Sequence, residues 1–514
     1  MVFSFYVRGL LPIVASLLLA FSPPLSKAQG RGQNQTRISK ADQLVLGKIS
    51  ANSMRGHLSF IASDLLEGRD SPSQGLDIAA EYIAAQFRRA GLEPIGDDGY
   101  FQTATVIEIA QQSVVFSLSI SRQGRDVDIL PDQVSAFLDK AVKISGARLY
   151  KLDAKDSSAI ASIIPDQVVG QAIIIERPQA GWLNIRDRLS GLKPALVIIV
   201  DRQMIRGPGV ARRRLIDPEK RKLEQPSSDV PFLTINNPEV VEMFDAMMPG
   251  LTNATLSVNA QAALEKRVKM RNVVGLVRGS DPVLKDTYVL VSAHYDHLGV
   301  DGSGRIYNGA NDNGSGAASV IELASALATR TTRPKRSLVF MTFFGEEKGE
   351  IGSQYYVEHP ILPLEKTIAN VNLEQLGRTD SLEGPVVASA TVTGFDFSEM
   401  TATFQAAGSL TGIRLYKHEL FSDRYFLHSD NASFARAGIP AHTIGVLFQY
   451  PDYHGIGDES TKIDYDNMAK VNRMLALGVL LLANASTTPK WNENNSQAAP
   501  YIEAWKRRHQ SLNR

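Results

Sequence analysis

The stretch Y-V-L-V-S-A-H-Y-D-H, residues 288–297, decides the fold class and points to the chemistry of the chain. Its first six residues form a short apolar run, which is typical of a strand that is buried on both faces of a sheet. His294 and Asp296 come at the end of this run, where open α/β sheets place their binding sites. Because side chains two residues apart point to the same side of a strand, Asp296 could orient the imidazole of His294.

Similar apolar runs occur at residues 337–344 and 368–373, while residues 314–327 and 466–482 have helical patterns. Alternation of apolar strands with helices predicts an α/β fold with a mixed, largely parallel sheet between helices. The segment 50–91 is also helical in pattern, and L-E-G-R-D-S-P-S forms a turn-rich link within it.

Carboxylates and a histidine follow these apolar runs. Glu346 and Glu347 occur in F-F-G-E-E-K-G-E-I-G-S, and Glu374 occurs in V-N-L-E-Q-L-G. Asp312 lies in the glycine-rich stretch G-A-N-D-N-G-S-G, and His454 lies in P-D-Y-H. Two adjacent carboxylates at the end of a buried strand repel each other unless a cation or a proton intervenes.

Imidazole and carboxylate ligands, in a chain without cysteine, suit Zn²⁺ or a similar divalent ion. Five ligands exceed one tetrahedral site but suffice for two metals about 3.5–4 Å apart that share a carboxylate, a device used for hydrolysis. Each motif also has a structural alternative. Glu346 and Glu347 could form a solvated acidic turn, and Glu374 could pair with Arg378. The stretch around Asp312 could instead serve to cap a helix, with Asn313 or Ser315 as the cap. His297 is expected to belong to the local structure.

The 514 residues are enough for two or three domains, and the net charge of +1 argues against nucleic acid or anionic membranes as partners. Arg8, an apolar run over 9–21 and the sequence Ser26-Lys27-Ala28 predict a signal peptide at residues 1–28. The alternative of an uncleaved membrane anchor is disfavoured, because a span needs ~20 apolar residues. We therefore expect an exported protein, periplasmic or secreted, with no stable membrane span after cleavage.

The composition and pattern of the sequence change between residues 113 and 265. Short β-branched runs alternate there with polar loops, and histidine is absent. This pattern predicts an inserted β-rich domain, since a structureless loop of that length would be unusual. Residues 50–112 and 266–485 then form the catalytic domain. Residues 29–49 are expected to be a flexible segment, and residues 486–514 a polar tail.

The motifs A-H-Y-D-H, G-A-N-D-N-G-S-G, F-G-E-E-K-G-E-I-G-S, N-L-E-Q-L-G and D-Y-H together resemble the co-catalytic zinc aminopeptidase family. Its relatives include glutamate carboxypeptidase and the transferrin receptor. Residues 267–484 look like its catalytic core, a zinc exopeptidase fold, and residues 54–103 look like its N-terminal helices. The segment 113–265 is placed where many members carry a protease-associated domain.

The resemblance implies a site with two Zn²⁺ ions. His294, Asp312 and Glu374 would hold one ion. Asp312, Glu347 and His454 would hold the second, so that Asp312 bridges the pair. The family usually has aspartate where this chain has Glu374, a change that bears on the spacing and the preference of the metals.

Roles in catalysis also follow from the resemblance. Glu346 would be the general base that takes a proton from the attacking water, and Asp296 would orient His294. Tyr453 matches a position where some members use a hydroxyl to support the oxyanion. The resemblance further implies a cis peptide bond after Asp312.

These observations predict an exported metallo-exopeptidase that removes N-terminal residues from a peptide substrate. A carboxypeptidase or dipeptidase on the same core is the first alternative, and residues 212–214, Arg-Arg-Arg, are its candidate for binding a substrate carboxylate. A catalytically silent, receptor-like binding protein and a glutaminyl-cyclase-like transferase with one zinc are further alternatives. The sequence indicates no oligomeric state.

Overall fold

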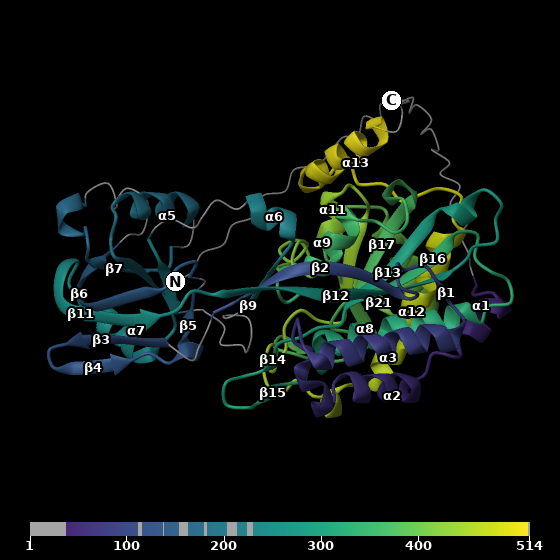
Figure 1. The fold of residues 1–514 in the computed structure, drawn as a ribbon. Helices are drawn as coiled ribbons and strands as arrows, with labels where there is room; N and C mark the ends of the chain where they lie inside the picture. Colours follow the sequence, from purple (N-terminus) through teal and green to yellow (C-terminus); the bar gives the residue numbers. More distant parts are fainter. Residues whose placement is uncertain are drawn as a thin grey trace, which may run out of the picture. The chain divides into compact units, whose positions relative to one another are not determined.

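The computed structural model describes residues 37–111, 116–136, 138–153, 163–178, 182–202, 213–223 and 230–511. The predicted signal peptide and Arg212 lie outside these residues. Two large sheets, each with its own hydrophobic core, organise the described residues (Figure 1).

The larger sheet has ten strands in the order β21-β20-β22-β17-β13-β16-β12-β2-β9, with β1 (Glu93–Pro94) beside β12. Its centre is parallel, and every residue of the central strands is buried. The central strands are β16 (Ser337–Phe343), β13 (Tyr288–His294), β17 (Thr367–Leu373) and β22 (Ala441–Gly445).

The two sides of this parallel centre differ. On one side the strands are antiparallel: β12 (Leu264–Val277), β2 (Phe101–Ala110) and β9 (Arg213–Ile216). On the other side β20 (Ser389–Val392) runs antiparallel to β22, and β21 (Arg414–Tyr416) runs parallel to β20. The predicted α/β fold with a mixed sheet is confirmed.

Helices cover both faces of the larger sheet (Figure 1). Alternate residues of β13 show this, because Val289 and Val291 belong to one hydrophobic cluster and Leu290 belongs to another. The first cluster includes side chains of α2 (Ala51–Ile61), α3 (Gln74–Ala90), α8 (Ser315–Ala328), α10 (Met400–Thr411) and α12 (Tyr465–Asn484). The second includes side chains of α9 (Ile351–Glu358), α11 (Asn431–Arg436) and α13 (Ala499–Ser511).

The helix ends follow ordinary capping chemistry. The side chain of Ser73 accepts a hydrogen bond from the amide of Leu76 at the start of α3, and Gly91 ends that helix with a φ of 75°. The helices predicted within 50–91, 314–327 and 466–482 are thereby confirmed as α2 and α3, α8, and α12.

A second sheet of eight strands, in the order β4-β3-β11-β6-β7-β8-β10-β5, is built from the segment predicted to be an insertion. Its strands are β3 (Phe116–Arg122), β4 (Arg125–Asp128), β5 (Val134–Ser135), β6 (Val142–Leu152), β7 (Ala172–Glu176), β8 (Leu196–Val200), β10 (Phe232–Ile235) and β11 (Gly250–Ala260). Two helices, α5 (Trp182–Gly191) and α7 (Pro238–Asp245), pack on opposite faces of it.

The segment 113–265 is not wholly separate from the larger sheet. Its strand β9 pairs with β2 there, in register from Ile107–Ile216 to Ala110–Arg213. Leu215 and Ile216 of β9 are buried, so the hydrophobic effect favours the position of this strand in the larger sheet. Within the described part of the chain, no helix has the length and apolarity to cross a membrane.

Candidate metal centre

The predicted site residues come from the carboxyl ends of neighbouring parallel strands. His294 is the last residue of β13, Glu346 and Glu347 follow β16, and Glu374 directly follows β17. Because these strands are parallel neighbours, their ends meet at one edge of the sheet. Asp312 reaches the same place from the loop before α8.

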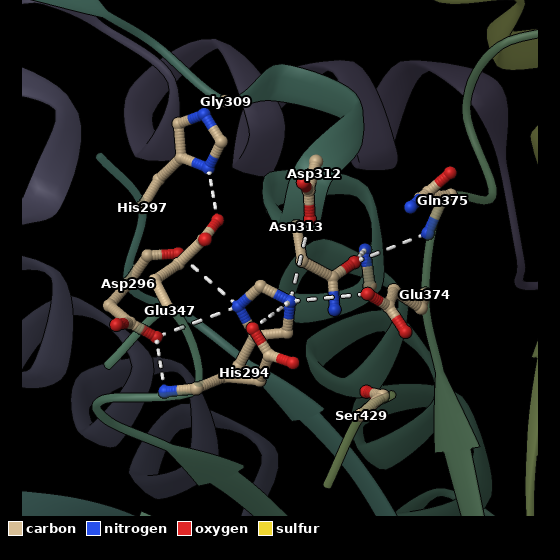
Figure 2. A network of polar contacts seen from close by, with 12 residues as sticks. His294, Asp296, His297, Gly309, Asp312, Asn313, Glu347, Glu374, Gln375 and Ser429 are labelled. Atoms are coloured by element: carbon tan, nitrogen blue, oxygen red, sulfur yellow. Dashed lines mark hydrogen bonds and ion pairs between the residues drawn. The ribbon is translucent and has the colours of Figure 1, made fainter. Parts of the chain in front are cut away.

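The first group of side chains surrounds the imidazole of His294. Its Nε2 lies 3.5 Å from Asp312 Oδ1 and 3.6 Å from Glu374 Oε1. Its Nδ1 lies on the other side, 3.5 Å from Asp296 Oδ1 and 3.3 Å from the Asp296 carbonyl (Figure 2). Asp296 therefore stands where a residue that orients a histidine ligand is expected.

The geometry around His294 Nε2 fits a cation. The atom is buried and has no hydrogen-bond partner among the described residues. Its distances to the two carboxylates exceed those of a good hydrogen bond. His294, Asp312 and Glu374 nevertheless offer ligand atoms that all lie within 4.8 Å of one another. A histidine and two carboxylates are a donor set that Zn²⁺ accepts.

The second group shares Asp312 with the first. His454 Nε2 lies 3.0 Å from Asp312 Oδ2 and 3.6 Å from Glu347 Oε2. Asp312 thus presents one oxygen to His294 and the other to His454. The structure brings the five predicted ligands together, with Asp312 between the two histidines as a bridging ligand would be.

His297 also reaches this second group. Its Nδ1 lies 2.8 Å from Glu347 Oε1, and its other ring nitrogen is buried without a hydrogen-bond partner among the described residues (Figure 2). The sequence pattern predicted only a local structural role for His297. This contact was not foreseen because β13 ends at His294, and strand alternation gives no direction for a side chain in the loop beyond.

The carboxylates differ in their tendency to bind protons. Burial raises the pKa of Glu346 well above its usual range, and the charges of Glu347 and Glu374 act in the same direction, against the charge of His294. Burial also disfavours the charged form of Asp312, but contacts with His294 and His454 hold its pKa well below the usual range. Such a divergence between neighbouring acids is typical of catalytic sites.

The backbone of the loop that carries Asp312 is held by the side chain of Asp458. Asp458 accepts hydrogen bonds from the amides of Asn311 and Asp312, at 2.9 and 3.0 Å. The peptide bond between Asp312 and Asn313 is cis, the form that the resemblance implies. A Cβ on Gly309 would lie 2.3 Å from the ring of His297, so the glycine permits a close approach. Asp458 was missed because nothing in G-I-G-D distinguishes it from an ordinary turn residue.

The structure does not support the alternative partner of Glu374. Arg378 pairs instead with Asp380 and with Asp452, whose Oδ2 lies 2.9 Å from the guanidinium. Glu374 therefore remains directed at His294. Arg213, from the basic stretch considered for substrate carboxylates, pairs with Asp70 and Glu108.

A cavity of about 250 Å³ opens beside the site. Its lining includes Glu374, Tyr453 and the aromatic side chains of Tyr425 and Phe448. The ring of Tyr453 stacks on that of His454, with centroids 4.1 Å apart. The phenol of Tyr453 is thus at the border between the ligand cluster and the cavity.

All of these ligands fall within one stretch of the chain that matches a known family. Residues 272–479 match peptidase family M28. This part of the chain is similar to that family. The family resemblance drawn from the motifs is thereby confirmed.

Curated relatives match over short stretches only. A glutamate carboxypeptidase 2 homolog from Caenorhabditis elegans is 32% identical over 132 residues, which are 24% of this chain and 16% of that protein. Aminopeptidase YwaD from Bacillus subtilis (strain 168) is 32% identical over 108 residues, 21% of this chain and 22% of that protein. The chain thus matches less than a quarter of the length of either relative.

The fold likeness extends much further than the sequence identity. The solved structure of an aminopeptidase from Aneurinibacillus sp. strain AM-1 has a TM-score of 0.63 and 20% sequence identity. The match covers 88% of this chain and 100% of that chain. It shows that this chain shares the fold of that solved structure.

Proposed function

We propose that this protein is a zinc-dependent aminopeptidase that removes N-terminal residues from peptides with the help of two metal ions. The observation that carries the proposal is the position of Asp312, whose two oxygens face the histidines of two separate ligand groups. The family match and the aminopeptidases among the similar proteins support it.

The residues of the site have two kinds of proposed role, as metal ligands and as groups that transfer a proton. His294, Asp312 and Glu374 would hold one ion, and Asp312, Glu347 and His454 would hold the other. Bound zinc ions would polarise the scissile carbonyl and acidify the attacking water.

Glu346 has the position and the electrostatics of the general base. Its Oε2 lies 3.9 Å from His294 Nε2, and its amide donates to Asp296 Oδ1 at 3.2 Å, which fixes the backbone beside the ligands. Glu346 would take the proton of the water and pass it to the leaving amine. The hydroxyl of Tyr453, at the mouth of the cavity, would donate to the developing oxyanion.

Arg213, one of the three arginines considered for a substrate carboxylate, pairs with Asp70 and Glu108, which favours the aminopeptidase over the carboxypeptidase. A carboxypeptidase needs a free cation for the substrate carboxylate. The proposal also includes export to the periplasm or medium, with cleavage of a signal peptide after Ala28. It further includes the assignment of residues 113–265 as a protease-associated-like domain. Both parts rest on the sequence pattern.

The test combines metal analysis with a substrate panel. Purified protein should contain about two zinc ions per chain, and chelation should abolish turnover of aminoacyl-p-nitroanilides and free peptides. Peptides with a blocked N-terminus should resist cleavage, while amidation of the C-terminus should have little effect. The reverse pattern would assign a carboxypeptidase, and metal-free active protein would exclude the mechanism.

A further inference from the structure

The tripeptide Arg69-Asp70-Ser71 lies far outside residues 272–479, the segment that carries the family match. It belongs to the turn-rich link between α2 and α3, and it follows Glu67 and Gly68, which both have left-handed backbone conformations. Each of its three residues contacts a different part of the metal centre. These contacts give the link a role that the family match does not assign.

Arg69 joins two of the loops that carry ligands. Its side chain is completely buried and donates from Nε to the carbonyl of Tyr295 at 2.8 Å. It also donates from Nη1 to the carbonyl of Asn308 and from Nη2 to that of Gly309, at 2.7 and 3.0 Å. Its own carbonyl accepts from the amide of His297 at 3.2 Å. Because a guanidinium is a rigid fork of donors, these bonds fix the loop after His294 relative to the loop before Asp312.

Ser71 binds the carboxylate of Asp296, which lies between His294 and the amide of Glu346. Its hydroxyl donates to Asp296 Oδ2 at 3.0 Å. The other oxygen of Asp296 accepts from the amide of Glu346 at 3.2 Å and faces His294 Nδ1 at 3.5 Å. Ser71 therefore restrains a side chain that touches both a ligand and the proposed base.

Asp70 contacts the loop of the two glutamates through Lys348. Its Oδ1 lies 2.9 Å from Lys348 Nζ, and the Lys348 side chain is only 2% exposed. Its Oδ2 lies 3.4 Å from Arg213 Nη1 on β9. Lys348 directly follows Glu347, and the amide of Gly349 donates to the carbonyl of Glu346 at 2.8 Å. The turn is short, so a fixed Lys348 limits the movement of both glutamates.

We propose that Arg69, Asp70 and Ser71 are positioning residues that set the spacing of the three ligand-bearing loops of the metal centre. The proposal rests on the metal site of the proposed function, but its first readout is zinc affinity and not peptide cleavage. Loss of groups that support metal ligands typically costs about 10–100-fold in affinity.

Variants of the Asp70–Lys348 pair can show whether the pair affects zinc binding by positioning the loop of the two glutamates or only through its charges. If the pair acted only through its field, Asp70→Asn would weaken zinc binding and Lys348→Met would strengthen it, because the two variants remove opposite charges. If the pair positions the loop, both variants weaken binding by about 10–100-fold. The double variant should then lose no more than the worse single variant, and Lys348→Arg should recover part of the loss.

Zinc dissociation constants from competition with a fluorescent chelator give the first readout, and kcat and KM on an aminoacyl-p-nitroanilide give the second. We expect kcat of zinc-loaded Asp70→Asn and Lys348→Met to fall about 10–100-fold while KM changes little, since small displacements of catalytic groups have effects of this size. Asp42→Asn is the matched control. Asp42 lies in α1 (Lys40–Leu46) and pairs at 2.8 Å with Arg330, which follows α8. This ion pair is also largely buried, and the variant breaks it.

The control should lower the melting temperature while leaving zinc affinity and kcat unchanged. The proposal is wrong if Asp70→Asn and Lys348→Met behave like this control, or if they shift zinc affinity in opposite directions. If wild-type protein cleaves no peptide but both variants still lose zinc affinity, the positioning role stands and only the peptidase assignment fails.

Discussion

Glu346 and Glu347 are adjacent in the chain but face different partners. Glu347 contacts His297 and His454, whereas the nearest histidine to Glu346 is His294, at 3.9 Å. Burial disfavours the charged form of both, yet the charge of His454 lowers the pKa of Glu347, while the pKa of Glu346 is raised. Without a bound metal, Glu347 thus favours the charged form and Glu346 the protonated form.

This difference predicts opposite losses in two glutamine variants. Glu346→Gln should keep its zinc and lose turnover by about 10²–10⁴-fold, the usual contribution of a general base. Glu347→Gln should bind zinc more weakly, because it removes an anionic ligand. Metal analysis and turnover on a chromogenic aminoacyl substrate measure both. Equal loss of zinc in the two variants, or normal turnover of Glu346→Gln, would contradict the assignment of Glu346 as base and Glu347 as ligand.

The two histidines near Glu347 should also be separable. We expect His454→Ala to lose one of two zinc ions, because His454 Nε2 faces both Asp312 and Glu347. His297→Gln should retain two ions with an affinity about 10–100-fold lower, as expected for a group that supports a ligand. Metal content after dialysis against a buffered zinc solution decides between them. Retention of both ions in His454→Ala and loss of one in His297→Gln would make His297 the ligand.

At the scale of elements, continuous apolar runs predicted the central strands, and the ends of these strands predicted the positions of His294, Glu346, Glu347 and Glu374. Runs such as 288–293 and 368–373 became central parallel strands, so their ends had to meet. Contacts made by irregular backbone had no such signal. The roles of Asp458 and Arg69 depend on hydrogen bonds to loop carbonyls and amides, which a sequence pattern does not specify. The pairing of β9 with the larger sheet was not foreseen either, because residues 213–216 lie within the segment predicted to form an inserted domain.

The strand β22 carries a histidine that should make stability depend on pH. His442 is buried against the rings of Phe426 and Trp491, and its ring nitrogens contact Ser398 Oγ and the Thr393 carbonyl at 2.6 and 2.7 Å. Burial lowers the pKa of His442 to about 4 from an ordinary value of 6.5. The unfolded chain therefore binds a proton between pH 6.5 and 4 that the folded protein does not.

It follows that the free energy of unfolding should fall as the pH is lowered through this range. One proton contributes about 1.4 kcal/mol per pH unit, so His442 accounts for a loss on the order of 3 kcal/mol. His442→Gln should reduce the difference in stability between pH 7 and pH 4.5, as measured by urea unfolding. An unchanged pH dependence in His442→Gln would show that folding does not shift the pKa of His442. Burial lowers the pKa of His57 to about 4 as well. His57 should therefore contribute to the loss of stability at low pH in the wild-type protein and in His442→Gln alike.

At the scale of the whole molecule, the metal centre gathers segments that are far apart in the chain. The link at 69–71, the strand ends at 294 and 374, and the loop at 454–458 all meet there. The site is also rich in carboxylates. Asp296, Asp312, Glu346, Glu347 and Glu374 gather around His294, His297 and His454, with the guanidinium of Arg69 close by. Such a cluster repels itself when no cation is bound. The stability of the larger sheet and the binding of metal should therefore be coupled.

Removal of metal should accordingly lower the melting temperature at neutral pH. A ligand present at 100 times its dissociation constant stabilises the folded state by about 2.7 kcal/mol, which corresponds to a shift of several degrees. Calorimetry with a chelator, followed by addition of zinc, measures the loss and its recovery. Asp312→Asn should respond little to zinc, because one residue serves both ligand groups. Glu346→Gln should respond as strongly as wild type, because the general base is not a ligand. A chelator that leaves the melting temperature of wild-type protein unchanged would break the link between the carboxylate cluster and a bound metal.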